Sequence, residues 1–447
     1  MKVVYNGDIV NEGKRFRGYV VTEGEMIVEV GHGMPSPCMI EASEDDIDAE
    51  GGLILPGVID DHVHFRDPGL THKADMVSES RAAVAGGVTS FMDMPNTVPN
   101  TTTIKALEDK FAHAAQESVA NYSFYIGATN DNLAELKAVD YSRVCGIKAF
   151  LGSSTGGMLL SAPEAMRRVF SETDALIAIH SEDEDIIRAN RARYVAACGE
   201  NLPLRYHELI RSREACFACT QRAVQLASEC DTRLHIMHIS TADELALLSV
   251  APLGEKRITA EACIAHLNFN NSDYERLGNR IKCNPAVKSA ADQQALQRAV
   301  NEGLIDVIGT DHAPHLLSEK QGGCLQAASG IPMVQFSLVV MLEQARQGIF
   351  TTETVVEKMC HAPALLFGIE RRGFLRRGYQ ADIAVVVPEP SGHTLSDADV
   401  LSKCGWTPLE GFTVHHRVKA TLVNGHTAYL NGRVNEAVRG QRLTFTH

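Results

Sequence analysis

Two histidines one residue apart follow an apolar run near the beginning of the chain. The stretch Ile59–Gly69 reads IDDHVHFRDPG, and the residues just before it are mostly apolar. Side chains at i and i+2 of a strand point the same way, so we expect Asp60, His62 and His64 to share one face. Two imidazoles that converge on one point suit a divalent metal such as zinc. Because a His-x-His pair is common by chance, further ligands must come from elsewhere in the chain.

The middle of the chain alternates apolar strand candidates with helical stretches such as SESRAAVAGG and IKALEDKFAHAAQ. This alternation predicts an α/β fold, a (β/α)8 or TIM barrel. An open doubly wound sheet is the alternative, but no Gly-x-Gly-x-x-Gly follows the first strand. The strands we expect are residues 57–64, 89–93, 123–126, 146–150, 176–180, 233–238, 258–261 and 306–310.

The two ends of the chain have a different pattern, with short strands and turns. Residues 1–52 contain VVYNGDIV and GYVVTEGEMIVEVG, and residues 378–447 contain ADIAVVVP and TLVNGHTAYLNGRV. Asn-Gly pairs between apolar runs are typical of hairpins. We therefore predict one small β-sandwich domain formed from both termini, and a barrel over residues 53–377.

Chemistry-bearing residues stand at the carboxyl ends of the predicted barrel strands, where barrels carry their active sites. A histidine or lysine at one such place has ordinary explanations, such as a surface residue or a side chain reaching solvent. Six at the same rim are much harder to explain in that way. They are His62, His64, Lys148, His180, His238 and Asp311.

Lysine is the unusual member of this set, because an ammonium group repels metal ions. A buried lysine can lose its proton, and the neutral amine can react with CO2 to form a carbamate, an anionic ligand with two oxygens. Such a group can bridge two metals, which together can activate a shared water as hydroxide near neutral pH. The glycine-rich stretch LGSSTGGM after this strand lacks the lysine of a P-loop, so we do not assign it to phosphate binding.

Four motifs resemble the dihydroorotase family of the cyclic amidohydrolase superfamily, and the likeness extends over nearly the whole chain. They are LILPGVIDDHVHFRDPG at 53–69, DMPNT at 93–97, KAF at 148–150 and TDHAPH at 310–315. The resemblance implies a metal-dependent, reversible opening of dihydroorotate to N-carbamoyl-L-aspartate in pyrimidine synthesis. It also implies two divalent ions, with zinc expected.

The resemblance assigns the metal ligands residue by residue. His62, His64 and Asp311 would hold one metal, His180 and His238 the second, and Lys148, as N6-carboxylysine, would bridge them. Some relatives have an aspartate shortly after the lysine position and lack the carbamate. Here Leu151, Gly152, Ser153 and Ser154 follow, so the modified lysine is favoured. Asp311 would also carry the proton between the water and the leaving ring nitrogen.

Arg66 suits the carboxylate of dihydroorotate, because a planar guanidinium can bind a carboxylate through two hydrogen bonds. By resemblance, Asn96 and His315 would complete this pocket, although asparagine is also common in turns such as the one at Asn96. Asn284, in KCNPAVK, would bond the ring, and Ser329 and Gly330 would contribute main-chain groups. His64 also belongs to this substrate-binding side.

Two alternatives remain open at this point. Related amidohydrolases open hydantoins, dihydropyrimidines or allantoin, substrates without the ring carboxylate. A non-catalytic relative that serves as a scaffold is the other, although such proteins usually lose metal ligands. Ala265 and Lys288 stand where relatives often have histidine and arginine, which leaves the subgroup open. Measurements of metal content and of turnover of dihydroorotate, dihydrouracil and allantoin would distinguish these alternatives from a dihydroorotase.

The composition limits the kinds of binding partner and the cellular compartment that we expect. A net charge of −14 argues against nucleic acid or an anionic membrane. Eleven cysteines without a disulfide framework favour a reducing cytosol, and Cys216-x-x-Cys219 suits helix packing. No long apolar stretch or signal-peptide core is present, so we expect a cytoplasmic protein with a small-molecule substrate.

Further expectations concern assembly and loop motion. A homodimer and an association with aspartate carbamoyltransferase are the protein partners that the resemblance implies. Residues 316–328, LLSEKQGGCLQAA, follow the expected substrate pocket and contain two adjacent glycines. This segment is either a lid over the pocket or an ordinary surface loop.

Overall fold

The computed structural model describes residues 1–152 and 158–446. Ser153–Gly157 lie outside the described residues. They include Ser153 and Ser154, two of the four residues considered above for an acid after Lys148, and most of the glycine-rich stretch LGSSTGGM. The expectation for that stretch is therefore not addressed by the structure.

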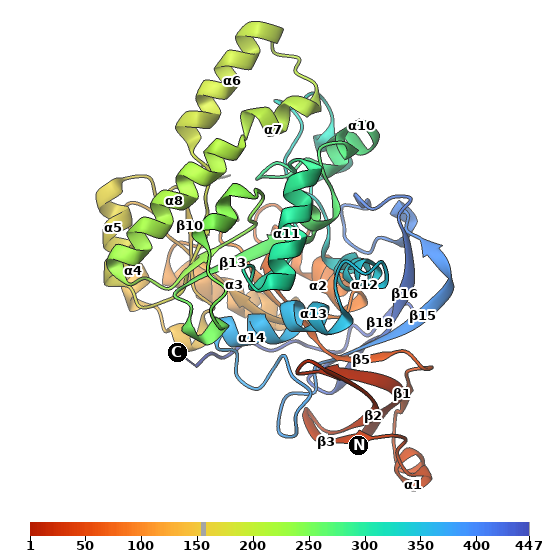
Figure 1. The fold of residues 1–447 in the computed structure, drawn as a ribbon. Coiled ribbons are helices and arrows are strands. Elements are labelled where there is room, and N and C mark those ends of the chain that lie inside the picture. Colours follow the sequence, from red (N-terminus) through yellow and green to blue (C-terminus); the bar gives the residue numbers. More distant parts are fainter. Residues whose placement is uncertain (153–157, 447) are drawn as a thin grey trace.

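A barrel of parallel strands forms the centre of the molecule, and each predicted strand is present within a few residues of its expected bounds (Figure 1). The strands pair in chain order, in one sheet of three and one of six. Their bounds are β6 Val58–Val63, β7 Val88–Asp93, β8 Asn121–Phe124, β9 Ile126–Gly127, β10 Ile147–Phe150, β11 Ile177–His180, β12 Leu234–Ile236, β13 Ile258–Cys263 and β14 Val307–Gly309.

Two junctions close this barrel. β8 and β9 are one strand interrupted at Tyr125, whose amide donates to the carbonyl of Asp93 at 3.1 Å. At the other junction Val63 bridges in parallel to His312, and the amide of His64 donates to the carbonyl of His312 at 2.7 Å. The first and last strands therefore meet beside the predicted metal ligands, and the (β/α)8 prediction is confirmed.

Helices surround the barrel and cover its strands (Figure 1). Their inner faces and the strands bury a continuous apolar core of Val, Ile, Leu, Phe and Ala side chains, which provides the main stabilisation. The helices are α2 Met76–Ala85, α3 Ile104–Glu117, α4 Leu133–Ala138, α5 Pro163–Glu172, α6 Glu184–Cys198, α7 His207–Ile210, α8 Arg213–Cys230, α9 Ile264–Asn268, α10 Asp273–Leu277, α11 Ala290–Glu302, α12 Ser337–Arg346, α13 Thr352–Val356 and α14 Ala362–Phe367.

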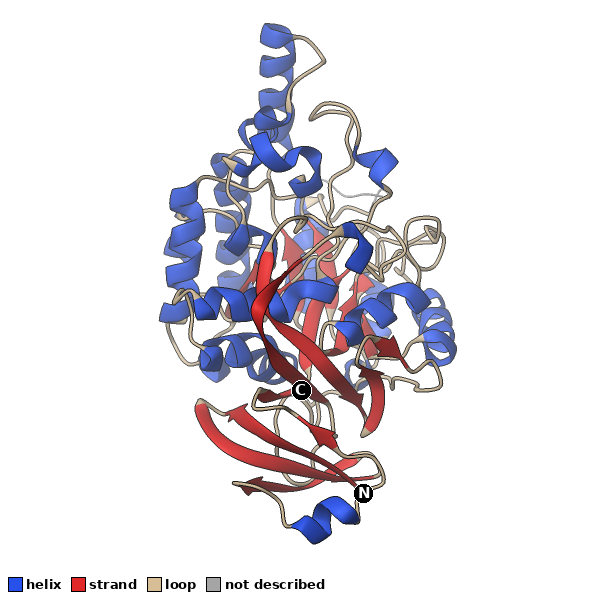
Figure 2. Ribbon diagram, turned by 90° about the vertical axis from the view of Figure 1, so that its right-hand side faces the viewer, coloured by secondary structure: helices blue, strands red, loops and turns tan. Residues whose placement is uncertain are grey.

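A nine-stranded mixed sheet joins both ends of the chain into the predicted β-sandwich domain. Its strands near the N-terminus lie below the barrel in Figure 2, whereas β15 and β16 lie beside the barrel in Figure 1. Its order is β18-β17-β16-β15-β5-β1-β2-β3, with β4 paired to β1, and α1 (Pro37–Glu41) lies beside it. The strands are β1 Lys2–Asn11, β2 Lys14–Glu23, β3 Met26–His32, β4 Ile47–Asp48, β5 Leu53–Pro56, β15 Ile383–Thr394, β16 Thr413–Val423, β17 His426–Leu430 and β18 Arg433–Val434.

β5 connects this domain to the barrel. It pairs with β1 on one side and β15 on the other, and the chain then enters β6 through Gly57. The start of the apolar run before the two histidines therefore lies in the terminal sheet, and its continuation lies in the barrel.

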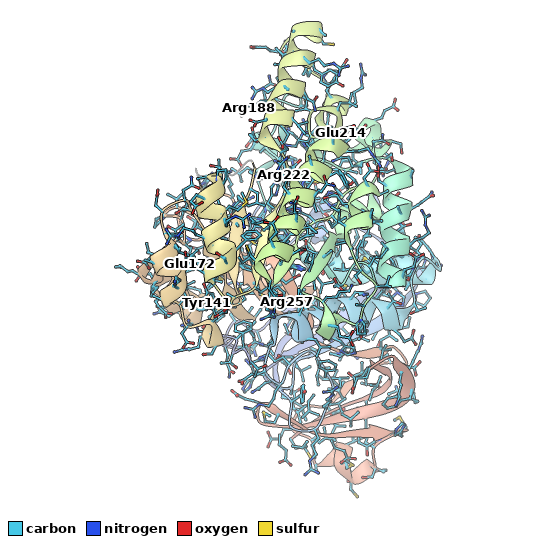
Figure 3. The ribbon with its side chains drawn as sticks, turned by 60° about the vertical axis from the view of Figure 1, so that its left-hand side comes forward. Tyr141, Glu172, Arg188, Glu214, Arg222 and Arg257 are labelled. Atoms are coloured by element: carbon cyan, nitrogen blue, oxygen red, sulfur yellow. The ribbon has the colours of Figure 1, made fainter. Side chains whose placement is uncertain are left out.

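The outer helices carry charged side chains, as Figure 3 shows for Glu172 on α5, Arg188 on α6 and Arg222 on α8. On the inner side of α8, Cys216 and Cys219 are buried, which confirms that the Cys-x-x-Cys pair packs within a helix. Within the described residues, no helix combines the length and apolar character that a membrane crossing requires.

Candidate metal centre

The carboxyl ends of the barrel strands enclose a cavity of about 180 Å3. Every site residue expected from the sequence lines it, together with Phe150, Arg211 and Ala313. The expected residues are His62, His64, Arg66, Asn96, Lys148, His180, His238, Asn284, Asp311, His315, Ser329 and Gly330. The barrel has thus brought together residues that are widely separated in the chain, as the strand-end argument requires.

His62, His64 and Asp311 form one group of potential metal ligands. Oδ1 of Asp311 lies 3.3 Å from Nε2 of His62 and 3.2 Å from Nε2 of His64. Burial opposes the ionised carboxylate, but the two histidines outweigh it and hold the pKa of Asp311 well below its usual range. The aspartate is therefore an anion, as a metal ligand must be.

The other ring nitrogens of these histidines have acceptors behind them. Nδ1 of His62 donates to the carboxylate of Glu261 at 2.9 Å, and Nδ1 of His64 donates to Oδ1 of Asn96 at 2.8 Å. Each Nε2 faces the anionic oxygen of Asp311. Burial opposes a charged ring, but the carboxylates of Glu261 and Asp311 outweigh it and raise the pKa of His62, so its Nε2 can hold a proton toward Asp311 when no metal is bound. Backing acceptors of this kind are usual for histidine metal ligands, and a divalent cation would take the place of that proton.

His180 and His238 form the second group. Nδ1 of His180 lies 2.9 Å from Nε2 of His238, and Nε2 of His180 donates to Glu182 at 2.9 Å. Burial lowers the pKa of both histidines, so both rings are neutral and able to coordinate. Arg211 forms an ion pair with Glu182 and keeps that carboxylate ionised. These residues therefore fit a second divalent cation, in agreement with zinc's preference for imidazole.

Lys148 is almost completely buried and lines the same cavity as the two groups of histidines. Its Nζ lies 2.8 Å from the sulfur of Met237 and 5.1 Å from the ring centroid of Phe150. The described residues place no carboxylate within ion-pair distance of it. Burial lowers the pKa of Lys148 to about 8, so more of the amine is neutral near neutral pH than in an exposed lysine.

Three residues of the cavity have left-handed backbone conformations that are unusual for side chains other than glycine. The φ angles are 66° for Arg66, 41° for His238 and 48° for Asp311. Such conformations cost of order 1–3 kcal/mol each and persist where the surrounding structure holds them. All three lie just beyond strand ends, where the strained turn directs the side chain into the cavity.

Arg66 lies on the side of the cavity next to His64 and is buried. Its Nε donates to the carbonyl of Pro314 at 3.0 Å, and Nη2 lies 3.2 Å from Nε2 of His315. Among the described residues, no carboxylate is paired with this guanidinium. Burial and the charge of Arg66 lower the pKa of His315, so the imidazole beside this cation is neutral.

Asn284, Ser329 and Gly330 form a further part of the cavity wall. Oδ1 of Asn284 is buried and has no hydrogen-bond donor among the described residues. Gly330 has a φ of 136°, and a Cβ there would lie 2.6 Å from the carbonyl oxygen of Ala313. Glycine is therefore needed at this position for the wall to approach Ala313 and His315.

Asp60 does not follow the strand expectation, since it is not among the residues that line the cavity. Its carboxylate instead accepts from Oγ1 of Thr310 at 2.6 Å, and burial raises its pKa to about 7. The pairing of β6 with β7 shifts register between Asp60 and Val63, which interrupts the two-residue alternation of side chains. Asp60 therefore braces β14 and does not share the metal-facing set with His62 and His64.

Three residues with roles in this site were not singled out from the sequence. Glu182 stands two residues after His180, and Glu261 is the last residue of the predicted seventh strand, so carboxylates at strand ends were the available signal. Arg211 lies between α7 and α8, and no pattern around it indicates a site. Glu261 also belongs to two deeper buried groups, one with His62 and Cys263 and one with Asp61 and His235.

Comparison with known families agrees with this geometry. The model of the amidohydrolase family matches residues 53–428, which include every residue that lines the cavity. The chain belongs to the amidohydrolase family.

Individual relatives indicate to which group of amidohydrolases this chain is most similar. A dihydroorotase of Halobacterium salinarum is 36% identical over 411 residues, which are 91% of this chain and 92% of that protein. An allantoinase of Bacillus velezensis is 30% identical over 436 residues, 96% of this chain and 94% of that protein. The L-hydantoinase (dihydropyrimidinase) structure from Arthrobacter aurescens matches with a TM-score of 0.92 and 27% identity over 99% of both chains.

These likenesses place the amidohydrolase among the cyclic amide hydrolases of the dihydroorotase, allantoinase and hydantoinase group. They name three substrates for closely similar folds. The choice among these substrates must therefore come from the side chains of the cavity.

Proposed function

We propose that this amidohydrolase is a dihydroorotase, which reversibly hydrolyses (S)-dihydroorotate to N-carbamoyl-L-aspartate. The observation that carries the proposal is the buried guanidinium of Arg66, which faces the cavity beside the metal ligands without a paired carboxylate. A buried unpaired charge is costly, and a carboxylate on the substrate would neutralise it. Dihydroorotate carries such a group, whereas hydantoin, dihydrouracil and allantoin carry no carboxylate on the ring.

His62, His64 and Asp311 would hold one divalent ion and His180 and His238 the other, with zinc the expected metal. Lys148 would bridge the two after its neutral amine adds to CO2, forming an N–C bond and releasing one proton. When bound, the two cations lower the pKa of a water molecule and polarise the ring carbonyl of the substrate. The low pKa of the Lys148 amine supports the modification.

Asp311 would move the proton. Its ionised carboxylate can accept a proton from the attacking water and deliver it to the ring nitrogen as the amide bond breaks. In the reverse direction the same carboxylate takes the proton from the ureido nitrogen of carbamoyl-aspartate. Its contacts with His62 and His64 support this role, because they would hold it beside the reacting atoms in both directions.

The remaining cavity residues would orient the ring. Arg66 would bind the carboxylate with help from Asn96 and His315, and His64 would lie against the same part of the substrate. Oδ1 of Asn284, which lacks a donor among the described residues, would accept a ring N–H. Ser329 and Gly330 would offer main-chain groups to the other polar atoms of the ring.

The decisive experiment compares dihydroorotate, dihydrouracil, hydantoin and allantoin as substrates for the metal-loaded protein. We expect turnover of dihydroorotate at least 100-fold above the others in kcat/KM, since each of the others leaves Arg66 unpaired. Preference for a neutral ring would replace the proposal with a hydantoinase or allantoinase activity. Two bound metals with no turnover of any ring would indicate a non-catalytic relative.

A further inference from the structure

Lys320 lies outside the metal centre, in the segment 316–328 for which the sequence left a lid or a surface loop open. It ends the short 3-10 helix Leu317–Lys320, and its side chain is buried despite its charge. The amide of Cys324 ties the surrounding segment to the loop after α6, since it donates to the carbonyl of Leu202 at 2.9 Å. The amide of Ala328 closes the segment on itself, since it donates to the carbonyl of Glu319 at 2.9 Å.

The ammonium group of Lys320 donates to three backbone carbonyls. Nζ lies 2.9 Å from the oxygens of Lys282 and Ala328 and 2.8 Å from that of Gly330. These carbonyls flank the substrate-facing residues, because Lys282 precedes Asn284 by two positions and Ala328 precedes Ser329 by one. One side chain therefore ties together two backbone segments of the cavity wall.

Trp406, the only tryptophan of the chain, extends this arrangement to the C-terminal region. Nζ of Lys320 lies 5.6 Å from the centroid of its buried ring, within cation–π distance. Nε1 of Trp406 donates to the carbonyl of His315 at 2.7 Å. The indole thus connects the Lys320 ammonium with the backbone of a residue that lies against Arg66.

Three carbonyl acceptors suit an ammonium group at Lys320. Burial lowers the pKa of Lys320 to about 7, and among the described residues no carboxylate is paired with it. Three carbonyls accept one proton each from an ammonium, whereas a neutral amine has only two to donate. Loss of the charge would release one of the three carbonyls, and an apolar side chain would release all of them.

We propose that Lys320 is a positioning residue for the substrate pocket: it sets the wall formed by Asn284, Ser329 and Gly330 and, through Trp406, the backbone of His315. This inference rests on the proposed function, because it assigns Lys320 to the binding of the ring and not to the metals. Trp406 contacts Lys320 and the backbone of His315. Its fluorescence should therefore respond both to replacement of Lys320 and to substrate binding in the pocket.

The test uses Lys320→Met in the full-length, metal-loaded protein. We expect KM for dihydroorotate to rise about 10- to 100-fold, while kcat changes less than about threefold and metal content stays at the wild-type value. The emission of Trp406 should shift to longer wavelength before any ligand is added. In the wild type, saturating dihydroorotate should change that emission with the same midpoint as KM, and the variant should need correspondingly more.

Lys358→Met is the matched control. Lys358 is also largely buried and donates to one carbonyl, that of Ile305 at 2.9 Å, before β14 at the other end of the barrel. Its replacement should leave KM and Trp406 emission unchanged. Trp406→Phe keeps an aromatic ring and removes the donor to His315, so a smaller rise in KM, about 3- to 10-fold, is expected.

Unchanged KM in folded, metal-loaded Lys320→Met would overturn the proposal, and so would a loss of metal in that variant. If Lys320→Met does not fold, Trp406→Phe decides, and an unchanged KM there overturns the proposal. A failure of the proposed function is visible separately, as a wild type without turnover of dihydroorotate. In that case two measurements still test the role of Lys320. They are the emission shift of unliganded Lys320→Met and the KM of the variant for whichever cyclic amide the wild type turns over.

Discussion

Oδ1 of Asp311 lies 3.2 Å from Nε2 of His64, where the last strand of the barrel meets the first. Because Nδ1 of His64 donates to Asn96, the facing nitrogen presents a lone pair to an anion. This contact fits a divalent cation, and in the proposed mechanism the ionised carboxylate of Asp311 would also carry the proton.

Asp311→Asn should keep the shape of the side chain and one ligating oxygen but lose the proton carrier. We expect a folded, metal-loaded variant whose kcat falls by orders of magnitude in both ring opening and ring closure, since one group serves both directions. Both directions should be measured at matched metal occupancy. Near-normal kcat in either direction would show that Asp311 is only a ligand and that another base moves the proton.

Lys148→Ala should remove the proposed bridge between the two metals. We expect loss of most bound metal and activity, and partial recovery of both when a small carboxylic acid such as acetate or propionate is supplied. Metal analysis after gel filtration, with and without the acid, measures this. Two metals retained in the alanine variant without any added acid would exclude the bridging role.

Reconstitution of the apoprotein should depend on pH through Lys148. The pKa of this lysine is lowered to about 8 by burial, and only the neutral amine adds to CO2. At fixed dissolved CO2, the rate of activation by zinc should therefore rise as pH increases from 7 to 9 and level off above the pKa. The control is activation of Lys148→Ala with acetate, whose rate should lack that rise; a parallel rise in both would assign the pH dependence to the histidines.

Arg66→Met should remove the proposed partner of the substrate carboxylate. The expected loss in kcat/KM for dihydroorotate is about 2–4 kcal/mol, the scale of a charge-assisted pair, with metal content unchanged. Arg222→Met is a suitable control, because Arg222 pairs with Asp183 at the surface of α8, where such pairs contribute little. Undiminished turnover by Arg66→Met would mean that the carboxylate is bound elsewhere in the cavity.

Much of the site could be predicted from the sequence because the pattern of apolar residues indicates where each strand ends. Apolar runs locate the strands, and barrel topology brings their carboxyl ends to one rim. His62, His64, Lys148, His180, His238 and Asp311 follow from that rule. The β-rich termini were equally readable from alternation and turns. Resemblance added the residues outside strands, such as Asn284 and Gly330, for which spacing alone carries no signal.

Only the tertiary structure decided which hydrogen-bond and ion-pair partners these residues have. The backing of His180 by Glu182 and Arg211, the turn of Asp60 away from the cavity by a register shift, and the three carbonyls gathered by Lys320 all depend on contacts between distant segments. Local sequence determines the backbone elements through short-range hydrogen bonding and the burial of apolar faces. The partners of a buried charge are determined by which loops meet around it, and that is a property of the closed barrel and its terminal domain together.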